Sequence, residues 1–101
     1  MSARIVGHAP FIALLLNTAQ SQQKALIKTL TGEQTLVLVE ILMNILTATH
    51  LDKKFIAKKK HFLRHFSKKK KLAYKKRYLK QHPIQALHVL NFFREDLLEL
   101  L

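Results

Sequence analysis

A chain of 101 residues in which 49% are hydrophobic has the length of one small domain and can bury a single core. The sequence has no cysteine, two glycines and two prolines, which excludes disulfides, thiolate metal sites and cysteine nucleophiles and disfavours turn-rich β folds. The net charge is +12, with 18 Lys and Arg against six Asp and Glu. We therefore expect an all-α domain, a compact bundle of four or five helices, with a polyanion as partner.

The positive charge is concentrated in one part of the chain. Residues 1–52 hold three Lys or Arg and three Asp or Glu, and residues 81–101 hold one and three. Residues 53–80 hold fourteen Lys or Arg and no acid. The single domain is thus expected to consist of an apolar helical core (1–52), a basic helical segment (53–80) and an amphipathic packing helix (83–101).

Local signals predict the helices of the N-terminal half. Pro10 favours the start of a helix over the apolar run to Leu16, which we interpret as part of the mature protein and not as a signal peptide. Ser21 is expected to cap a second, short helix. Thr31 and Gln34 match a capping box, which predicts a third helix over about 32–48. No apolar stretch reaches the roughly 18–20 residues that a membrane-spanning helix needs.

The helix over about 32–48 is apolar on nearly every face, which indicates a central helix surrounded by protein. Its polar exceptions fall on one line: Glu33, Glu40, Asn44 and Thr47. We expect this line to face solvent; the alternative is a polar contact inside an oligomer interface.

The basic segment has an apolar side despite its charge. Asp52 is expected to cap its first helix, and helical spacing relates Phe55, Ile56, Phe62, Leu63 and Phe66. Ser67 and the four lysines 68–71 allow a break, so the segment is either one helix or two. Helical spacing then continues through Leu72, Tyr74, Tyr78 and Leu79.

Pro83 opens the last predicted helix. Its apolar residues form a heptad seam that consists of Ala86, Leu90, Phe93, Leu97 and Leu100. We favour this seam as an oligomer interface, most simply of a homodimer, while the alternative is that it closes the core of its own chain. Glu95, Asp96 and Glu99 lie near the expected C-terminus of this helix, where the dipole disfavours anions, which suggests that lysines lie close by.

The sequence contains no motif for catalysis, and we expect neither an enzyme nor a cofactor. There is no glycine-rich phosphate loop, nucleophile elbow or cluster of zinc ligands. His61 and His65 have the i, i+4 spacing of a metal-binding pair, but the surrounding cations disfavour a metal, and surface or phosphate-contacting histidines are the preferred interpretation. Tyr74 and Tyr78 are expected to pack between helices; the alternative is stacking on unpaired bases.

The basic segment predicts nucleic-acid binding, with DNA the favoured partner and RNA left open. Twelve of its fourteen cations are Lys, which favours contacts with the phosphate backbone over bidentate base recognition by Arg. The expected contact residues are Lys53, Lys54, Lys58, Lys59, Lys60, Arg64, Lys68, Lys69, Lys70, Lys71, Lys75, Lys76, Arg77 and Lys80.

Three stretches carry a resemblance to a known group: Lys24–Thr31 (KALIKTLT), Leu38–Leu46 (LVEI and NIL) and Lys59–Lys69 (KKHFLRHFSKK). Over about residues 10–80 the chain resembles the small basic proteins of Polinton (Maverick) elements and adintovirus-like DNA viruses, which are themselves similar to the small basic core peptide of adenoviruses. The resemblance implies a virion core or genome-packaging protein, located in the virion interior or the host nucleus and not secreted. After Gln81 the sequence departs from the pattern, because an amphipathic helix with acids replaces a Gly-Gly and a long apolar tail.

Two other functions are compatible with the same residues. In one, a structural protein oligomerises or docks on capsid proteins while its basic face binds an acidic protein surface. In the other, the basic amphipathic helix lies on an anionic membrane surface.

Overall fold

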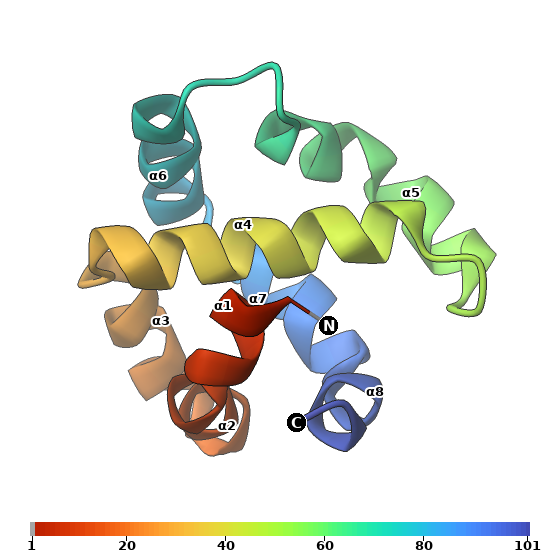
Figure 1. The fold of residues 1–101 in the computed structure, drawn as a ribbon. Helices are drawn as coiled ribbons and strands as arrows, with labels where there is room; N and C mark the ends of the chain where they lie inside the picture. The colour runs from red at the N-terminus through yellow and green to blue at the C-terminus, as the bar shows by residue number, and fades with distance from the viewer. Residues whose placement is uncertain (1) are drawn as a thin grey trace.

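The computed structural model describes residues 2–101, which are 79% helical and include no strand. It contains eight α-helices and one short 3-10 helix (Figure 1). Their bounds are α1 (Ala3–Gly7), α2 (Ala9–Asn17), α3 (Gln20–Lys28), α4 (Gly32–Thr47), α5 (Lys53–Leu63), the 3-10 helix η1 (Arg64–Phe66), α6 (Leu72–Gln81), α7 (Pro83–Phe92) and α8 (Arg94–Glu99).

The all-α prediction is confirmed, but the expected number of four or five helices is too low for three local reasons. An extra helix, α1, precedes the first proline and begins where the Ser2 hydroxyl accepts a hydrogen bond from the Ile5 N–H at 3.2 Å. The basic segment is divided between two α-helices, and the predicted C-terminal helix is divided at Phe93. The division of the basic segment is one of the two alternatives that the sequence left open, whereas the division at Phe93 replaces one expected helix by two short ones.

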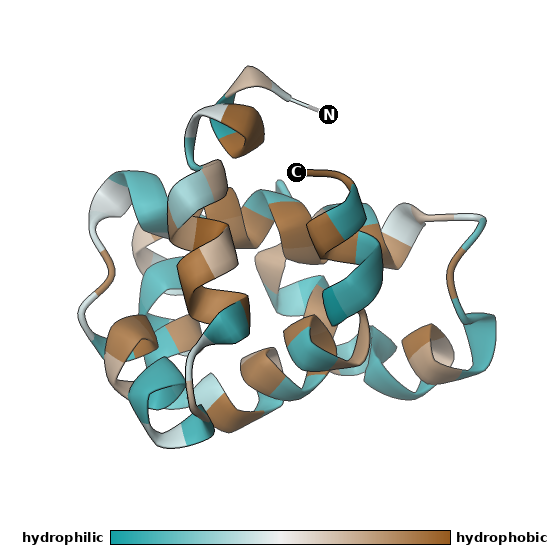
Figure 2. Ribbon diagram, turned by 90° about the horizontal axis from the view of Figure 1, so that it is seen from below, coloured by the Kyte–Doolittle hydropathy of each residue, from teal (hydrophilic) through white to brown (hydrophobic). Residues whose placement is uncertain are grey.

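Helix α4 occupies the centre of the molecule, as predicted. It crosses the whole structure, with α5, η1 and α6 on one side and α1, α2 and α3 on the other (Figure 1). Val37, Leu38 and Leu42 are completely buried. The predicted capping box is present: the Gln34 N–H donates to the Thr31 hydroxyl at 3.1 Å, and the Thr31 N–H donates to the Gln34 side chain at 3.0 Å. The helices α1, α2, α3, α5, α6 and α7 bury part of their surface, whereas α8 has no buried residue. Apolar and hydrophilic residues alternate along the helices (Figure 2).

The start of α3 differs from the prediction. Its N-cap is Ala19, whose carbonyl accepts hydrogen bonds from the N–H groups of Gln22 and Gln23, both at 2.9 Å. Ser21 therefore lies exposed inside the first turn and does not cap the helix. Pro10 lies in the first turn of α2, one residue after its start, as a residue without an N–H can.

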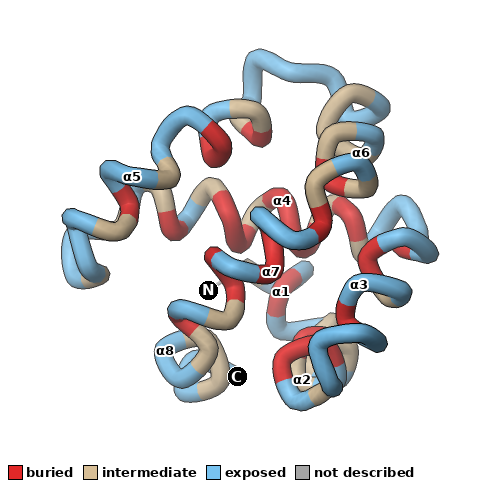
Figure 3. The backbone as a smooth tube through the Cα atoms, turned by 180° about the vertical axis from the view of Figure 1, so that it is seen from behind, coloured by how far each residue is buried: buried red, intermediate tan, exposed pale blue. Residues whose placement is uncertain are grey.

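The basic segment forms two helices separated by a linker. Asp52 caps α5 as predicted, since its carboxylate accepts from the Phe55 N–H at 3.0 Å. Residues 67–71 separate η1 from α6, and the lysines in this linker are all exposed (Figure 3). Four consecutive cations without an acid repel one another, which favours a solvated turn over a continuous helix.

The C-terminal seam turns into the core of its own chain. Ala86, Leu90 and Phe93 are at most 2% exposed, so they are not available to a second copy of the protein. Leu97 is half-buried, and Leu100 is 57% exposed. Among the five residues expected at an oligomer interface, only the last two have surface to offer a partner. Dimerisation through the exposed end of the seam remains a prediction.

The break at Phe93 also changes the position of the C-terminal acids. Because a new helix starts at Arg94, Glu95 and Asp96 lie in its first turn, where the helix dipole favours anions. Within residues 2–101 neither they nor Glu99 forms an ion pair. The expected neighbouring lysines therefore do not account for the position of these carboxylates.

Two polar contacts connect the C-terminal helices to the N-terminal half. The buried Gln23 side chain exchanges two hydrogen bonds with the Asn91 amide, at 3.0 and 3.1 Å, and also donates to the Leu15 carbonyl at 2.8 Å. Arg94 donates to the Leu16 carbonyl at 2.9 Å. These bonds satisfy a buried amide and the uncapped end of α2 together.

The position of the seam yields a first prediction. Replacing Leu90 by Glu places a charge in a closed apolar site, at a cost comparable to the whole stability of a small domain, about 5–15 kcal/mol. We expect the Leu90→Glu protein to lose most of its helicity in far-ultraviolet circular dichroism. Leu100→Glu, a matched change at an exposed position, should stay helical. A helical Leu90→Glu monomer derived from a dimeric wild type would contradict the assignment and support the dimer seam.

Candidate nucleic-acid interface

The fourteen Lys and Arg of residues 53–80 are here together called the basic face. It is carried by α5, η1, the linker and α6, which lie together on one side of α4 (Figures 1 and 3). Ten of these side chains belong to exposed residues; the half-buried ones are Lys59, Lys75, Lys76 and Lys80. The elements that carry the fourteen predicted contact residues thus lie together on one side of α4.

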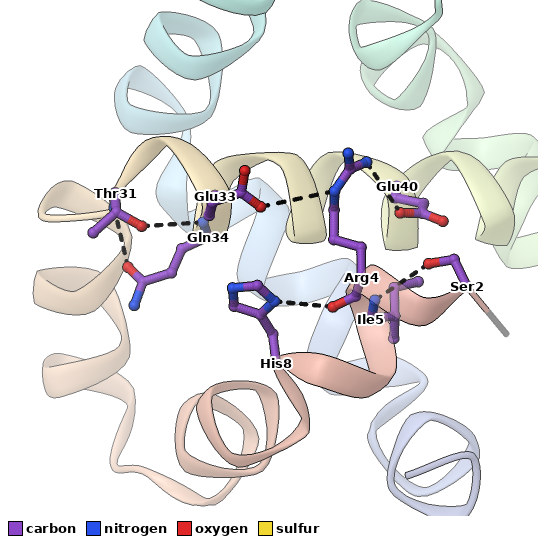
Figure 4. Close-up of polar contacts among 8 residues, drawn as sticks. All are labelled: Ser2, Arg4, Ile5, His8, Thr31, Glu33, Gln34 and Glu40. Atoms are coloured by element: carbon purple, nitrogen blue, oxygen red, sulfur yellow. Dashed lines mark hydrogen bonds and ion pairs between the residues drawn. The ribbon is translucent and has the colours of Figure 1, made fainter.

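The cations of the basic face are not neutralised within the protein. Among residues 2–101 the ion pairs all belong to Arg4, which lies 3.9 Å from a Glu33 oxygen and 3.7 Å from a Glu40 oxygen (Figure 4). The remaining acids are Asp52, which caps α5, and the three carboxylates of α8. Helix α8 lies on the opposite side of α4 from α6 (Figure 1). The molecule therefore has a strongly positive side and a mildly negative corner.

Apolar side chains on the inner side hold the basic face in place. Phe62 and Leu63 of α5, Phe66 of η1 and Leu79 of α6 are buried, and all three elements pack against α4. The helical spacing noted in the sequence has therefore directed the apolar residues inward and the cations outward.

An aromatic cluster joins η1 to α6. The His65 and Tyr78 rings are stacked with centroids 3.9 Å apart and planes inclined by 11°. The Tyr74 hydroxyl is hydrogen-bonded to His65 Nδ1 at 2.7 Å, and Lys70 Nζ lies 5.0 Å from the centre of the Tyr74 ring. Both tyrosines are half-buried and pack between helices, the preferred interpretation of the sequence. The face of Tyr78 that covers His65 is not open to a nucleic-acid base.

The two histidines at i, i+4 spacing do not form a metal site with a third ligand. The His61 and His65 rings are nearly perpendicular, with centroids 5.3 Å apart. Within residues 2–101 no group of three or more His, Asp or Glu could hold a metal ion.

Burial and neighbouring cations change the titration of the cluster. Desolvation by burial lowers the pKa of His65, and the nearby His61, Lys70 and His82 lower it further. Burial, followed by the neighbouring Tyr74, raises the pKa of Tyr78. The cluster therefore favours the neutral forms of His65 and Tyr78, in a region that already carries a large positive charge.

The polar line on α4 is only partly a solvent-facing strip. Glu33, Asn44 and Thr47 are exposed as expected, but Glu40 is half-buried because the Arg4 side chain of α1 covers it (Figure 4). One Glu40 oxygen is buried without a hydrogen bond. Its charge is balanced by Arg4 within the same chain, so an oligomer partner is not needed to explain it.

Two lysines that the sequence analysis did not assign to the site extend the basic surface. Lys24 and Lys28 of α3 line a hollow of about 420 Å³ together with Lys80, at the end of α6. They were missed because residues 1–52 have no net charge and because their proximity to α6 is tertiary. The available signal was their i, i+4 spacing on the polar side of α3.

No protein-family model, no curated protein and no solved structure matches this chain. No single helix among residues 2–101 is long and apolar enough to cross a membrane. Helices α3 and α4 meet these criteria only when taken together, and the chain bends by 118° between them.

The lowered pKa of His65 yields a second prediction. Above about pH 6.5 this histidine is neutral in both states, so it makes no pH-dependent contribution. As the pH falls below that value, the unfolded chain binds the proton more readily than the folded protein, and stability is lost. We expect the free energy of unfolding in urea to fall between pH 7.5 and pH 5.5.

The matched variants assign this loss to one ring. His65→Phe keeps a flat ring in the stack but cannot titrate, so its unfolding free energy should depend less on pH. His50→Gln, at an exposed position before α5, should retain the wild-type dependence. Equal pH dependence in His65→Phe and the wild type would refute the role of His65.

Proposed function

We propose that this protein binds nucleic acid through the phosphate backbone, without reading its sequence. The observation that carries the proposal is the basic face: fourteen cations on one side of a small domain, with no carboxylate within 4.0 Å of any of them among residues 2–101. A polyanion supplies the missing counter-charge and releases its condensed counterions on binding.

The dimensions of the molecule support this kind of contact. The domain is 29 × 29 × 28 Å, so it covers about eight base pairs at about 3.4 Å each and roughly sixteen phosphates. The number of cations is similar to this number of phosphates. A single copy can therefore contact six to ten phosphates from one side of a duplex, with the remaining cations facing solvent.

The chemistry of the cations supports backbone contacts over base recognition. Twelve of the fourteen are Lys, which binds phosphate as a point charge. The two arginines, Arg64 and Arg77, lie exposed on separate elements, η1 and α6. This arrangement lacks the group of base-reading side chains on one recognition helix that sequence-specific proteins place in the major groove.

We further propose that the bound nucleic acid is DNA and that the protein packages it, as a virion core protein in the virion interior or the host nucleus. This biological setting rests on the resemblance to the basic proteins of Polintons and adintovirus-like viruses. The alternative partner is an acidic protein surface, for example on a capsid shell, bound by the same cations. A folded acidic protein has fewer condensed counterions than a duplex, so its binding should depend less steeply on salt.

The proposal yields a third prediction, on salt dependence. If six to ten phosphates are contacted, the affinity for duplex DNA should fall by about 10³- to 10⁵-fold between 50 and 200 mM salt. Replacing Lys58, Lys59, Lys60 and Arg64 by Gln should reduce the slope of log K against log salt by up to about 3.6, at about 0.9 for each lost contact. Fluorescence anisotropy with AT-rich and GC-rich duplexes measures the slope and the sequence preference together.

A variant on the opposite side of the molecule is the control. Neutralising Glu95, Asp96 and Glu99 raises the net charge by three but removes no cation from the basic face, so the slope should be unchanged. An unchanged slope in the Lys/Arg variant, or a strong preference for one duplex, would overturn the proposal.

A further inference from the structure

The hollow between α3, the end of α6 and the start of α7 combines positive charge with a concave shape. Three lysines line it: Lys24 and Lys28 from α3, and Lys80 from α6. His82, between α6 and α7, also lines it, and no Asp or Glu of the described residues does. Lys24 and Lys28 lie outside the basic face and meet its Lys80 across this hollow. Arg4 lines another hollow with Lys68 and Lys75, but Glu40 lines that one too.

The elements around the hollow are held rigidly. Helix α3 packs against both α6 and α7, and the buried Gln23 side chain, next to Lys24 in the sequence, is hydrogen-bonded to Asn91 of α7. Ile27, next to Lys28, is completely buried. The backbone that carries both lysines is therefore fixed while their side chains reach outward from exposed positions. Such a site needs little rearrangement to receive an anion.

The charge of the hollow indicates which anion fits. An internal phosphodiester carries one negative charge, and single lysines of the basic face suffice for it. Three lysines around one hollow match a group with greater charge, and a phosphomonoester carries about −1.5 to −2 at pH 7 with three acceptor oxygens. The first turn of α7 adds a minor attraction, because its N-cap His82 makes no side-chain hydrogen bond and leaves the first N–H groups uncapped.

We propose that this hollow is a phosphomonoester-binding site, formed by Lys24, Lys28 and Lys80. Two sources have this chemistry: the terminal phosphate of a nucleic-acid strand, and a small free phosphate compound. The site adjoins the basic face through Lys80, so a strand bound there can place its phosphorylated end in the hollow. The first source rests on the proposed function, whereas the phosphate site itself does not.

The first test uses inorganic phosphate at constant ionic strength, with amide chemical shifts as the readout. We expect saturable shifts concentrated at residues 24–28 and 80–86. Losing two charged hydrogen bonds should weaken phosphate binding at least about tenfold in Lys24→Gln/Lys28→Gln. The matched control is Lys69→Gln/Lys70→Gln, which removes the same charge from the exposed linker and should bind phosphate as the wild type does. Equal weakening in both variants, or equally strong shifts at residues 68–71, would overturn the site.

The second test distinguishes the two sources. A short duplex with 5′-phosphates should bind more tightly than the same duplex with 5′-hydroxyls, and Lys24→Gln/Lys28→Gln should abolish the difference. If inorganic phosphate binds in the hollow but the two duplexes bind equally, the phosphate site stands and its source is a small compound. If the duplexes differ to the same extent in both double variants, the end of the strand binds elsewhere and the first source is wrong. The proposed function is tested separately, by the salt slope of the Lys58, Lys59, Lys60 and Arg64 variant, and none of these four residues lines the hollow. Failure of the hollow and failure of the proposed function are therefore separable.

Discussion

The structure depends on the burial of the inner side of the basic segment against α4. Helix α4 is apolar on most of its circumference, apart from the line of Glu33, Glu40, Asn44 and Thr47, and α5, η1 and α6 cover one of its apolar sides. Leu63, Phe66 and Leu79 are completely buried, and burial of each side chain contributes about 1.5–3 kcal/mol. Two exposed cations about 10 Å apart in water repel by only about 0.4 kcal/mol, and salt weakens this further. The burial of each of these side chains therefore contributes several times the repulsion of one such pair of cations.

Folding and binding therefore depend on different residues of the basic segment. The side chains that hold α5 and α6 to the core point inward, and the cations point outward with no partner that the fold requires. The exception is Arg4, which lies outside the basic segment and balances the half-buried Glu40. Charges of the basic face are consequently free to meet an external polyanion, and neutralising them leaves the core contacts intact.

Features determined by neighbouring residues were predictable from the sequence. The capping box at Thr31, the cap at Asp52 and the helix start at Pro83 each depend on interactions within one turn, and the structure has all three. The break at Phe93 and the cap at Ala19 were not predictable, because side-chain type favours Ser21 as the cap and the seam continues past Phe93.

The candidate site shows the same limit. The charge count identified the fourteen cations, since an acid-free stretch of the chain needs no tertiary information to be recognised. The spacing of Ala86, Leu90 and Phe93 predicted that these residues are buried. It did not predict whether a second copy or the same chain covers them, because a dimer interface and a monomer core have the same spacing. Lys24 and Lys28 join the site only through the packing of α3 on α6, a relation between residues more than fifty positions apart.

The linker between η1 and α6 has a consequence for the integrity of the chain. Residues 67–71 have one backbone hydrogen bond among themselves, from the Lys70 N–H to the Ser67 carbonyl at 3.1 Å, and their other two join Ser67 to η1 and Lys71 to α6. They present four exposed lysines in a row. Proteases that cleave after lysine act most readily at such exposed, non-helical segments. A cut there would leave an N-terminal fragment with α1 to α5 and η1, and a C-terminal fragment with α6 to α8 that still packs against α3 and α4. The nicked protein would therefore stay assembled, with its positive charge divided between two chains.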